Sequence, residues 1–376
     1  MTYWFLLLAF LIASVYALFF FYATIEWLKT REFTVLEKFN VVKFSIIIPF
    51  KDELNNLEIC IKSILAQNYP EDSFEILLAD DHSSDGSELV ALDYASKYSN
   101  IKYVINSGQG KKSAISTAIV QSSHHHLITT DADTSRNNKW LASFATMFNY
   151  KGVRVVAGGV MMIPRKNSAF HYFQSMDYSG MMALSMVAMR KGWFRNGSGG
   201  NLGFTKDVYF NYVLAQGDQN VVSGDDVFLL QSAFKEGQNT VIFPKSRDII
   251  SFTHTEQDWK DFIQQRSRWA GKSFKYTELA MTFIWALVWC SSILIPVLFG
   301  LSIAFGGIYI QLFAFNLMTK LLADLVFLKS STNYFDKSFF RYFFIAEFYH
   351  VSYVILVGIN AILGRKFEWK GTKYKR

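Results

Sequence analysis

The chain has 376 residues, of which 51% are hydrophobic and 17% are aromatic, and its formal net charge is +7. This length is sufficient for one large catalytic domain with additional segments. The central part shows no basic stripe with interleaved aromatic residues, so we exclude nucleic acid as a partner and attribute the positive charge to contact with an anionic membrane surface. Cys60 falls in a predicted amphipathic helix and Cys290 in an apolar segment, so neither indicates a disulfide or a metal site.

Long uncharged stretches predict membrane-spanning segments. Residues 3–25 contain no charged side chain and have about the length that crosses the roughly 30 Å hydrocarbon core of a bilayer. This stretch lacks the basic start, short apolar core and small-residue cleavage site of a signal peptide, so we expect it to be a retained anchor. Lys29, Arg31 and Lys38 follow it, and the positive-inside rule then places the central part of the chain in the cytosol.

Two further apolar regions lie in the last quarter of the chain. Residues 279–328 form a block that is long enough for two crossings, with interruptions expected at Pro296 and at Gly306-Gly307. Residues 342–363 form another candidate span. The sequence therefore predicts three or four crossings in total.

The basic tail conflicts with a count of four crossings. Residues 364–376 are rich in Lys and Arg and should stay in the cytosol, whereas four crossings would put them outside. We give the charge rule more weight and expect residues 338–350, which carry charged groups among aromatic residues, to lie in the membrane interface. Lys320 and Asp324 are four residues apart, which favours a structural ion pair over a proton relay. We expect an integral protein of the cell's inner membrane whose catalytic domain faces the cytosol.

Between these membrane segments, short apolar strands alternate with amphipathic helices. Strands are expected at residues 44–50, 74–79 and 101–105 and in a run that ends at residue 131, with helices near 57–65, 87–99 and 112–121. Three adjacent histidines, 124–126, cannot all face one ion, and we interpret them as a solvated lead-in to the fourth strand. The alternation predicts an α/β fold with a mostly parallel sheet that is covered by helices on both faces.

A polar cluster follows each of the four predicted strands. These clusters are residues 49–53, 80–87, 107–112 and 131–133. Because ligands of such folds bind beyond the carboxyl ends of the strands, we expect the four clusters to converge at one edge of the sheet. Carboxylates in them can accept hydrogen bonds from a nucleobase or ribose, and Lys111, which follows Gly110, can reach a pyrophosphate.

Asp131 and Asp133 form the strongest candidate for a metal site. If they end a strand, both carboxylates point to the same face, because residues i and i+2 of a strand share one face. Hard cations such as Mg²⁺ and Mn²⁺ favour such oxygen ligands and often hold phosphate oxygens as well. Taken alone, the same residues could form a turn rich in Asp and Ser.

The order of these motifs resembles the nucleotide-binding half of family 2 glycosyltransferases, which have the GT-A fold. Residues 223–230, Ser-Gly-Asp-Asp-Val-Phe-Leu-Leu, are similar to the acidic motif that opens a helix in that family. Residues 265–269, Gln-Arg-Ser-Arg-Trp, resemble the Gln-X-X-Arg-Trp motif of membrane-bound members such as the cellulose, hyaluronan and ceramide glucosyl synthases. Trp369-Lys370-Gly371 resembles the tail of these enzymes. The implied segments are an anchor at 1–28, a GT-A domain at 43–275, apolar helices at 279–363 and a basic cytosolic tail at 364–376.

The resemblance implies roles for individual residues. Asp226 would be the catalytic base, and Asp225 stays open as an alternative because it stands where many relatives have Glu. Asp133 and Asp131 would hold a divalent cation, Mg²⁺ or Mn²⁺. Substrate binding would involve Pro49, Glu53, Asp80, Asp81, Lys111, Asp131, Gln265, Arg268 and Trp269. Residues 197–203, rich in Gly, are interpreted either as a close approach of the backbone to an acceptor or as a plain loop.

These roles add up to an inverting glycosyltransferase. One base that activates an acceptor hydroxyl for a single displacement inverts the anomeric centre. The donor would be a nucleotide sugar, with UDP as the expected nucleotide, and the acceptor a membrane lipid or lipid-linked glycan. Three or four crossings appear few for a polymer channel, but a processive polysaccharide synthase remains an alternative, as does a non-catalytic scaffold that binds nucleotide sugar. A phosphatase of the haloacid dehalogenase type is disfavoured, because Ser135 stands where its Asp-X-Asp-X-Thr motif requires Thr.

Overall fold

The computed structural model describes the chain except for residues 1, 36–38, 217–224, 236, 238–239, 274–277, 364–366, 370–371 and 375–376. It divides the chain into two compact units. The sheet unit comprises Arg31–Met161 and Ala188–His254. The helical unit comprises Met1–Thr30, Met162–Val187 and Thr255–Arg376, so its segments alternate along the chain with those of the sheet unit.

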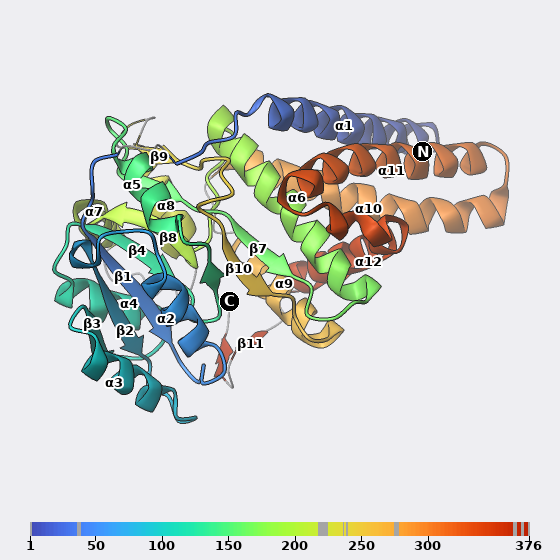
Figure 1. Cartoon of the computed structure of the whole chain (residues 1–376). Helices are drawn as coiled ribbons and strands as arrows, with labels where there is room; N and C mark the ends of the chain where they lie inside the picture. The colour runs from blue at the N-terminus through green and yellow to red at the C-terminus, as the bar shows by residue number, and fades with distance from the viewer. Residues whose placement is uncertain are drawn as a thin grey trace. The chain divides into compact units, whose positions relative to one another are not determined.

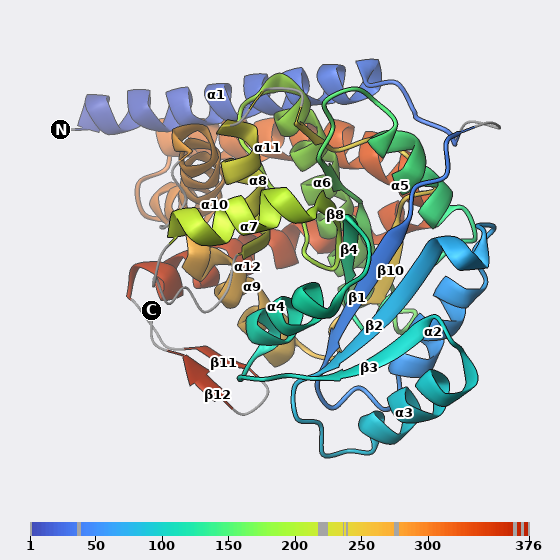
Figure 2. The same cartoon turned by 90° about the vertical axis from the view of Figure 1, so that its left-hand side faces the viewer.

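A seven-stranded sheet with the order β3-β2-β1-β4-β8-β6-β9 forms the centre of the sheet unit. Figure 2 shows five of its strands, β3, β2, β1, β4 and β8. The first four neighbours run parallel, β8 is antiparallel to both β4 and β6, and β9 is parallel to β6. Its strands are β1 (Phe44–Phe50), β2 (Phe74–Asp80), β3 (Ile101–Ile105), β4 (His126–Thr130), β6 (Val155–Ala157), β8 (Asn201–Thr205) and β9 (Val241–Ile242). The predicted α/β class with a mostly parallel sheet is confirmed, and the early strands fall within one or two residues of their predicted ends.

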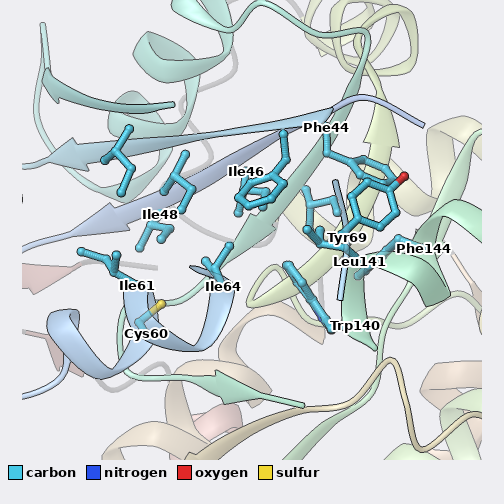
Figure 3. Close-up of a cluster of buried hydrophobic side chains, with 14 of the residues drawn as sticks. Phe44, Ile46, Ile48, Cys60, Ile61, Ile64, Tyr69, Trp140, Leu141 and Phe144 are labelled. Carbon is cyan, nitrogen blue, oxygen red and sulfur yellow. The ribbon is translucent and has the colours of Figure 1, made fainter. Parts of the chain in front are cut away.

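Helices cover both faces of this sheet. Every residue of β1 and β2 is buried, as their unbroken apolar runs require. On one face, Phe44, Ile46 and Ile48 pack with buried side chains of α2 and α5, as Figure 3 shows. The helices on this face are α2 (Leu57–Leu65), α3 (Ser87–Lys97) and α5 (Trp140–Phe148), whereas α4 (Lys111–Gln121) packs on the opposite face. Helices α7 (Lys206–Gln216) and α8 (Asp225–Lys235) pack against each other.

A small second sheet has the order β5-β10-β7. Its strands are β5 (Ser135–Arg136), β10 (Ser251–His254) and β7 (Val160–Ile163). The antiparallel pairing of Ser251 with Arg136 and of Phe252 with Ser135 fixes the chain directly after Asp133. The small sheet therefore supports the turn in which the candidate metal ligands lie.

The first residue of β4 differs from its prediction. His126 is half-buried, and its ring packs against the rings of Phe148 and Phe44 with centroid distances of 4.8 and 6.3 Å. The desolvation that results from this packing lowers the pKa of His126 to about 4, and the neighbouring His125 lowers it further. The last of the three histidines is thus part of the packed strand and not a solvated lead-in.

The helical unit contains four stretches that are long and apolar enough to cross a membrane, among the residues that the structure describes. They are Tyr3–Lys29, Leu279–Phe305, Ile308–Phe335 and Lys337–Ile362. Helix α11 (Ile308–Phe335) packs against α1 (Thr2–Lys29) and α10 (Leu279–Phe305), as Figure 1 shows. The unit also contains most of α6 (Ala169–Lys191), α9 (Trp259–Ser273), the short helix η2 (Lys337–Tyr342), α12 (Phe343–Ile362) and the hairpin β11 (Phe367–Trp369) and β12 (Thr372–Tyr374).

The second apolar block breaks at one place and not at both predicted places. Helix α10 continues through Pro296 and ends at Phe305, directly before Gly306. Gly306 and Gly307 have φ values of +64° and +55°, which residues with a side chain rarely adopt, and they form the link between α10 and α11. The proline is accommodated inside the helix, so its predicted interruption is wrong.

A buried charge cluster lies among the apolar helices. The ammonium group of Lys320 pairs with Asp324 and, at 3.1 Å, with Glu347, which confirms the predicted couple. Tyr16 of α1 donates a hydrogen bond of 2.6 Å to Asp324, and Lys320 Nζ lies 3.4 Å from Nδ1 of His350. Asp324, Glu347 and His350 are close enough to one another to resemble a metal site, but the lysine cation already occupies their centre.

This cluster accounts for Glu347 and His350, two of the polar groups that led us to expect residues 338–350 in the membrane interface. Glu347 is only 5% exposed and is paired inside the helical unit. Arg341 of the same segment is exposed, so the segment's interfacial position stays a prediction. The number of crossings stays a prediction.

Candidate active site

Asp131 and Asp133 lie in a turn after β4 and not on the strand itself. The strand ends at Thr130, so the predicted sharing of one strand face is wrong. Thr134 closes the turn instead, since its amide and its hydroxyl both donate to the Asp131 carbonyl, at 3.3 and 2.6 Å. Arg136, only 7% exposed, donates to the carbonyl and the hydroxyl of Thr134 at 2.9 and 2.7 Å. The turn is therefore held by its own residues.

The two carboxylates have the properties of a cation site. Among the described residues, Lys111 donates a hydrogen bond to Oδ1 of Asp131, and Thr253 donates one to Oδ2 of Asp133 at 3.1 Å. The second oxygen of each carboxylate remains for a metal. Part of the Asp133 side chain is accessible to solvent, but protein atoms surround its carboxylate and displace water from it. This desolvation is the largest cause that raises the pKa of Asp133 to about 6, and repulsion from Asp131 and Glu53 adds to it. A divalent cation would relieve this excess of negative charge, so Mg²⁺ or Mn²⁺ fits the donor set.

Lys111 connects this turn with the loop before α4. It is the first residue of α4, and its ammonium group pairs with Asp131. The preceding Gly110 has a φ of +86°, and its amide donates to Asp81 Oδ1 at 2.8 Å. The same oxygen accepts from Asn106 Nδ2 at 2.6 Å. Asp81 thus folds the loop that presents the lysine.

Asp80, the last residue of β2, has a comparable role. It is 4% exposed and accepts hydrogen bonds from the hydroxyl of Ser83 at 2.6 Å and from the hydroxyl of Tyr103 at 2.8 Å. Burial, and next the contact with Asp80, raises the pKa of the Tyr103 phenol. The carboxylates of Asp80 and Asp81 therefore accept hydrogen bonds that stabilise the loops after β2 and β3. Their contact with a nucleotide stays a prediction.

The ends of β1 and β2 are joined by hydrogen bonds between their loops. The amide of Glu53 donates to the Ser87 hydroxyl at 2.8 Å, and Asn56 donates to the Glu53 carboxylate at 2.8 Å. Asp52 and His82 have φ values of +52° and +60°, an uncommon conformation outside glycine that concentrates at functional sites. Pro49 is buried within β1 and places this loop. The predicted convergence of strand-end clusters is confirmed for the loops after β1 to β4 by these contacts and by the Lys111–Asp131 pair.

Two consecutive glycines connect the candidate metal site with the candidate base. The Gly199 amide donates to Oδ2 of Asp226 at 3.0 Å. A Cβ on Gly200 would lie 2.5 Å from Oδ2 of Asp131, closer than real contacts allow. The close approach expected for this Gly-rich loop is therefore an approach to two carboxylates. Asp225 begins α8, whereas its side chain and all of Ser223-Gly224 lie outside the described part.

Asn201, which follows this loop, is a residue that the sequence did not single out. It is fully buried, and its Oδ1 accepts from the indole of Trp140 at 2.9 Å. Its Nδ2 donates to the carbonyls of Gly159 and Ile249, both at 2.7 Å. One amide side chain thereby fixes the loop against α5 and two distant segments. No periodicity or motif marks such a residue.

The Gln-X-X-Arg-Trp residues lie in the helical unit, on α9. Gln265 is hydrogen-bonded to the Glu256 carboxylate. Burial and the nearby Asp261 raise the pKa of Glu256, although Arg266 and Arg268 oppose this shift. Arg268 and Trp269 are half-buried on the same helix. Lys370 and Gly371 of the predicted tail motif lie outside the described residues.

Together, the fold and the strand-end site define the class of the protein. A mixed, mostly parallel sheet with a carboxylate pair, a lysine and a further acidic residue at its carboxyl edge is the architecture of GT-A nucleotide-sugar transferases. Residues 45–211 match the family model described as Glycosyl transferase family 2. This part of the chain is therefore similar to the family 2 glycosyltransferase domain.

Named relatives agree with this class. The chain is 33% identical over 117 residues to glycosyltransferase AglE of Haloferax volcanii, a match that covers 31% of this chain and 38% of the relative. It is 22% identical over 349 residues to the "Probable glycosyltransferase YdaM" of Bacillus subtilis, covering 84% of this chain and 81% of that protein. The chain thus spans well under two thirds of the first relative and most of the second.

A solved structure supports the fold. The mannosyltransferase PcManGT from Pyrobaculum calidifontis, in complex with GDP-Man and Mn²⁺, is similar with a TM-score of 0.58 and 16% sequence identity. The similarity covers 94% of this chain and 99% of the other. It includes the segments outside the sheet unit.

Proposed function

We propose that the chain is a membrane-anchored, inverting glycosyltransferase that uses a nucleotide sugar, UDP-linked, and a lipid or lipid-linked acceptor. The observation that carries this proposal is the pair of consecutive glycines that contact Asp226 and Asp131. This arrangement keeps a candidate base beside a candidate metal and diphosphate site, as glycosyl transfer requires. The four apolar helices support an acceptor that resides in the membrane, with the sheet unit on the cytosolic side.

Lys111, Asp131 and Asp133 would bind the diphosphate end of the donor. The two carboxylates would hold Mg²⁺ or Mn²⁺, which supplies positive charge for the phosphate oxygens when bound. The Lys111 ammonium, already placed at the turn by Asp131, adds a second positive charge for the same oxygens. The nucleoside side would be lined by Pro49, Glu53, Asp80 and Asp81, since they lie at the ends of β1 and β2 or in the loops that follow them.

Asp226 would act as the base. Its carboxylate takes the proton from an acceptor hydroxyl while that oxygen forms a bond to the anomeric carbon of the sugar. The bond between this carbon and the diphosphate oxygen breaks at the same time, so an α-linked donor gives a β-linked product. Gln265 and Arg268 would contact the leaving diphosphate, and Trp269 would stack on a sugar ring. These three roles derive from the motif and not from a contact in the structure.

The proposal is tested with full-length protein purified in detergent. Release of nucleoside diphosphate is measured from a panel of UDP-sugars and from GDP-mannose, the donor type present in the similar solved structure. Each donor is assayed with Mn²⁺, Mg²⁺ or EDTA, and with or without a membrane-lipid extract. Release that needs both metal and lipid supports the proposal, and the product separates a single transfer from a polymer. Folded protein that releases nothing from any donor contradicts it.

A further inference from the structure

Arg266, one of the two residues that the Gln-X-X-Arg-Trp motif leaves unspecified, is the most buried residue of that segment at 4% exposure. Its Nη1 donates to Oε1 of Gln265 at 3.2 Å. Its guanidinium carbon lies 4.5 Å from the centre of the Trp269 ring, in a cation–π contact. One buried side chain thus contacts two of the three motif residues to which substrate binding is assigned, Gln265 and Trp269.

Asp177 of α6 determines where this guanidinium lies. Its Oδ2 accepts from Arg266 Nη2 at 2.9 Å, and both side chains are almost fully buried. Its Oδ1 accepts from the hydroxyl of Tyr353 of α12 at 2.9 Å. A single carboxylate therefore joins α9, α6 and α12, and its two oxygens face different helices.

Further contacts fix the position of helix α12 within the helical unit. Glu347 and His350 of this helix take part in the buried cluster around Lys320 of α11. The rings of His350 and Tyr353 are in edge contact, with centroids 5.5 Å apart. Helices α12 and α9 also pack directly against each other (Figure 1). The Tyr353 hydroxyl is consequently presented from a helix whose position the apolar bundle sets.

We propose that Arg266, held by Asp177 and Tyr353, is a positioning residue for Gln265 and Trp269, an assignment that rests on the proposed glycosyl transfer. The apolar helices thereby set the geometry of the motif helix through one buried carboxylate. A buried ion pair adds little to stability when it is compared with well-packed apolar residues of similar volume. Apolar residues cannot replace the hydrogen bond from Arg266 to Gln265 or the cation–π contact of Arg266 with Trp269.

That difference gives a decisive variant. The double substitution Arg266→Met with Asp177→Leu removes both charges and keeps an apolar volume, so no unpaired charge is left buried. The Tyr353 hydroxyl loses its acceptor, and thermal unfolding of the full-length variant checks that the folded state is retained. A purely structural ion pair predicts wild-type turnover in this variant. Positioning predicts that kcat falls at least tenfold while the KM for the nucleotide sugar stays within about twofold, because the nucleotide-binding loops belong to the sheet unit.

Tyr353→Phe is the milder variant, since it deletes only the hydroxyl and keeps the ring contacts with Phe173 and Phe262. We expect a threefold to tenfold loss of kcat with the same donor KM. Tyr349→Phe is its matched control: it makes the same change one turn earlier on α12, at a ring whose described contacts are aromatic. Its kcat and KM should equal those of the wild type.

Hydrogen–deuterium exchange of the α9 amides supplies a readout that does not need turnover. Full-length protein in detergent should show faster exchange in residues 259–273 for the double variant and for Tyr353→Phe, and unchanged exchange for Tyr349→Phe. Unchanged α9 exchange in both test variants, or wild-type kcat in the folded double variant, overturns the positioning role. If the wild type transfers no sugar although α9 is protected, the proposed function fails, and the exchange data alone still decide whether the network orders α9.

Discussion

The backbone amide of Gly199 donates a hydrogen bond of 3.0 Å to Oδ2 of Asp226, and the next residue, Gly200, leaves no room for a side chain beside Asp131. Two neighbouring backbone units therefore set the positions of two carboxylates that lie 95 residues apart in the chain, from 131 to 226. This relationship couples the geometry of the proposed base to that of the proposed metal site. Several measurable consequences arise from it.

Gly200→Ala should impair the metal site. The new Cβ would lie 2.5 Å from Oδ2 and 2.9 Å from Cγ of Asp131, so that carboxylate must move. We expect metal-stimulated release of nucleoside diphosphate to fall at least about tenfold, because small displacements of positioning groups are costly in catalysis. Gly199→Ala is the matched control, since its Cβ would meet Asp226 at an ordinary 3.5 Å and its amide hydrogen is kept. Equal losses in the two variants would contradict the steric explanation.

Asp226→Asn should abolish most transfer while donor binding persists. An amide cannot take the acceptor proton, and removal of a general base costs about 100-fold or more in rate. The comparison is Asp225→Asn, measured under the same conditions with saturating donor and lipid. Retained activity in Asp226→Asn together with loss in Asp225→Asn would move the base to Asp225.

The fold was largely predictable because its signals are local. A continuous apolar run such as Phe44–Phe50 specifies a strand buried on both faces, and β1 is buried along its whole length. Turn and helix-end residues mark the segments between the strands. Pro296 shows the limit of such rules, because α10 continues through it. Neighbouring helices, which local sequence does not encode, decide whether a proline interrupts an apolar helix.

The site was predictable only in its residue types. The polar clusters identified Asp131, Asp133 and Lys111, but the turn that places the two carboxylates depends on hydrogen bonds from Thr134 that strand periodicity does not indicate. Asn201 and Arg266 were missed for a common reason. The partners of Asn201 lie 42 to 61 residues away in the chain, and Asp177, which binds Arg266, lies 89 residues away, so no short pattern relates them.

Asn201→Ala should destabilise the sheet unit. It removes the hydrogen-bond partner of the Trp140 indole and of the Ile249 carbonyl inside the core, whereas the Gly159 carbonyl still accepts from the Ser251 amide at 2.9 Å. Unsatisfied buried polar groups are costly, and we expect a loss of about 2–4 kcal/mol in the free energy of unfolding. Asn138→Ala, at an exposed position, should change it by less than about 0.5 kcal/mol. Thermal unfolding of both full-length variants in detergent measures the difference, and similar midpoints would refute the role of Asn201.

His126 should make stability depend on pH in a defined window. Its pKa is about 4 in the fold, mainly because of burial, against an ordinary value of 6.5. Between these values the unfolded chain binds a proton that the folded chain does not, so stability falls as the pH drops from 6.5 towards 4. Because the ring is only half-buried, water screens part of the effect, and we expect about 1 kcal/mol between pH 7.5 and 5.

The variant His126→Phe isolates this contribution, because Phe148 and Phe44 already provide aromatic neighbours for a non-titrating ring. Its unfolding temperature should decline less between pH 7.5 and 5 than that of the wild type, by a few degrees. The exposed His125 is the control, and His125→Asn should keep most of the wild-type pH dependence. His125 lowers the pKa of His126 and Asp207 raises it, and both effects are smaller than that of burial. The pH dependence of the unfolding temperature should therefore change only slightly in His125→Asn. A slope in His126→Phe equal to that of the wild type would show that the buried imidazole is not the titrating group.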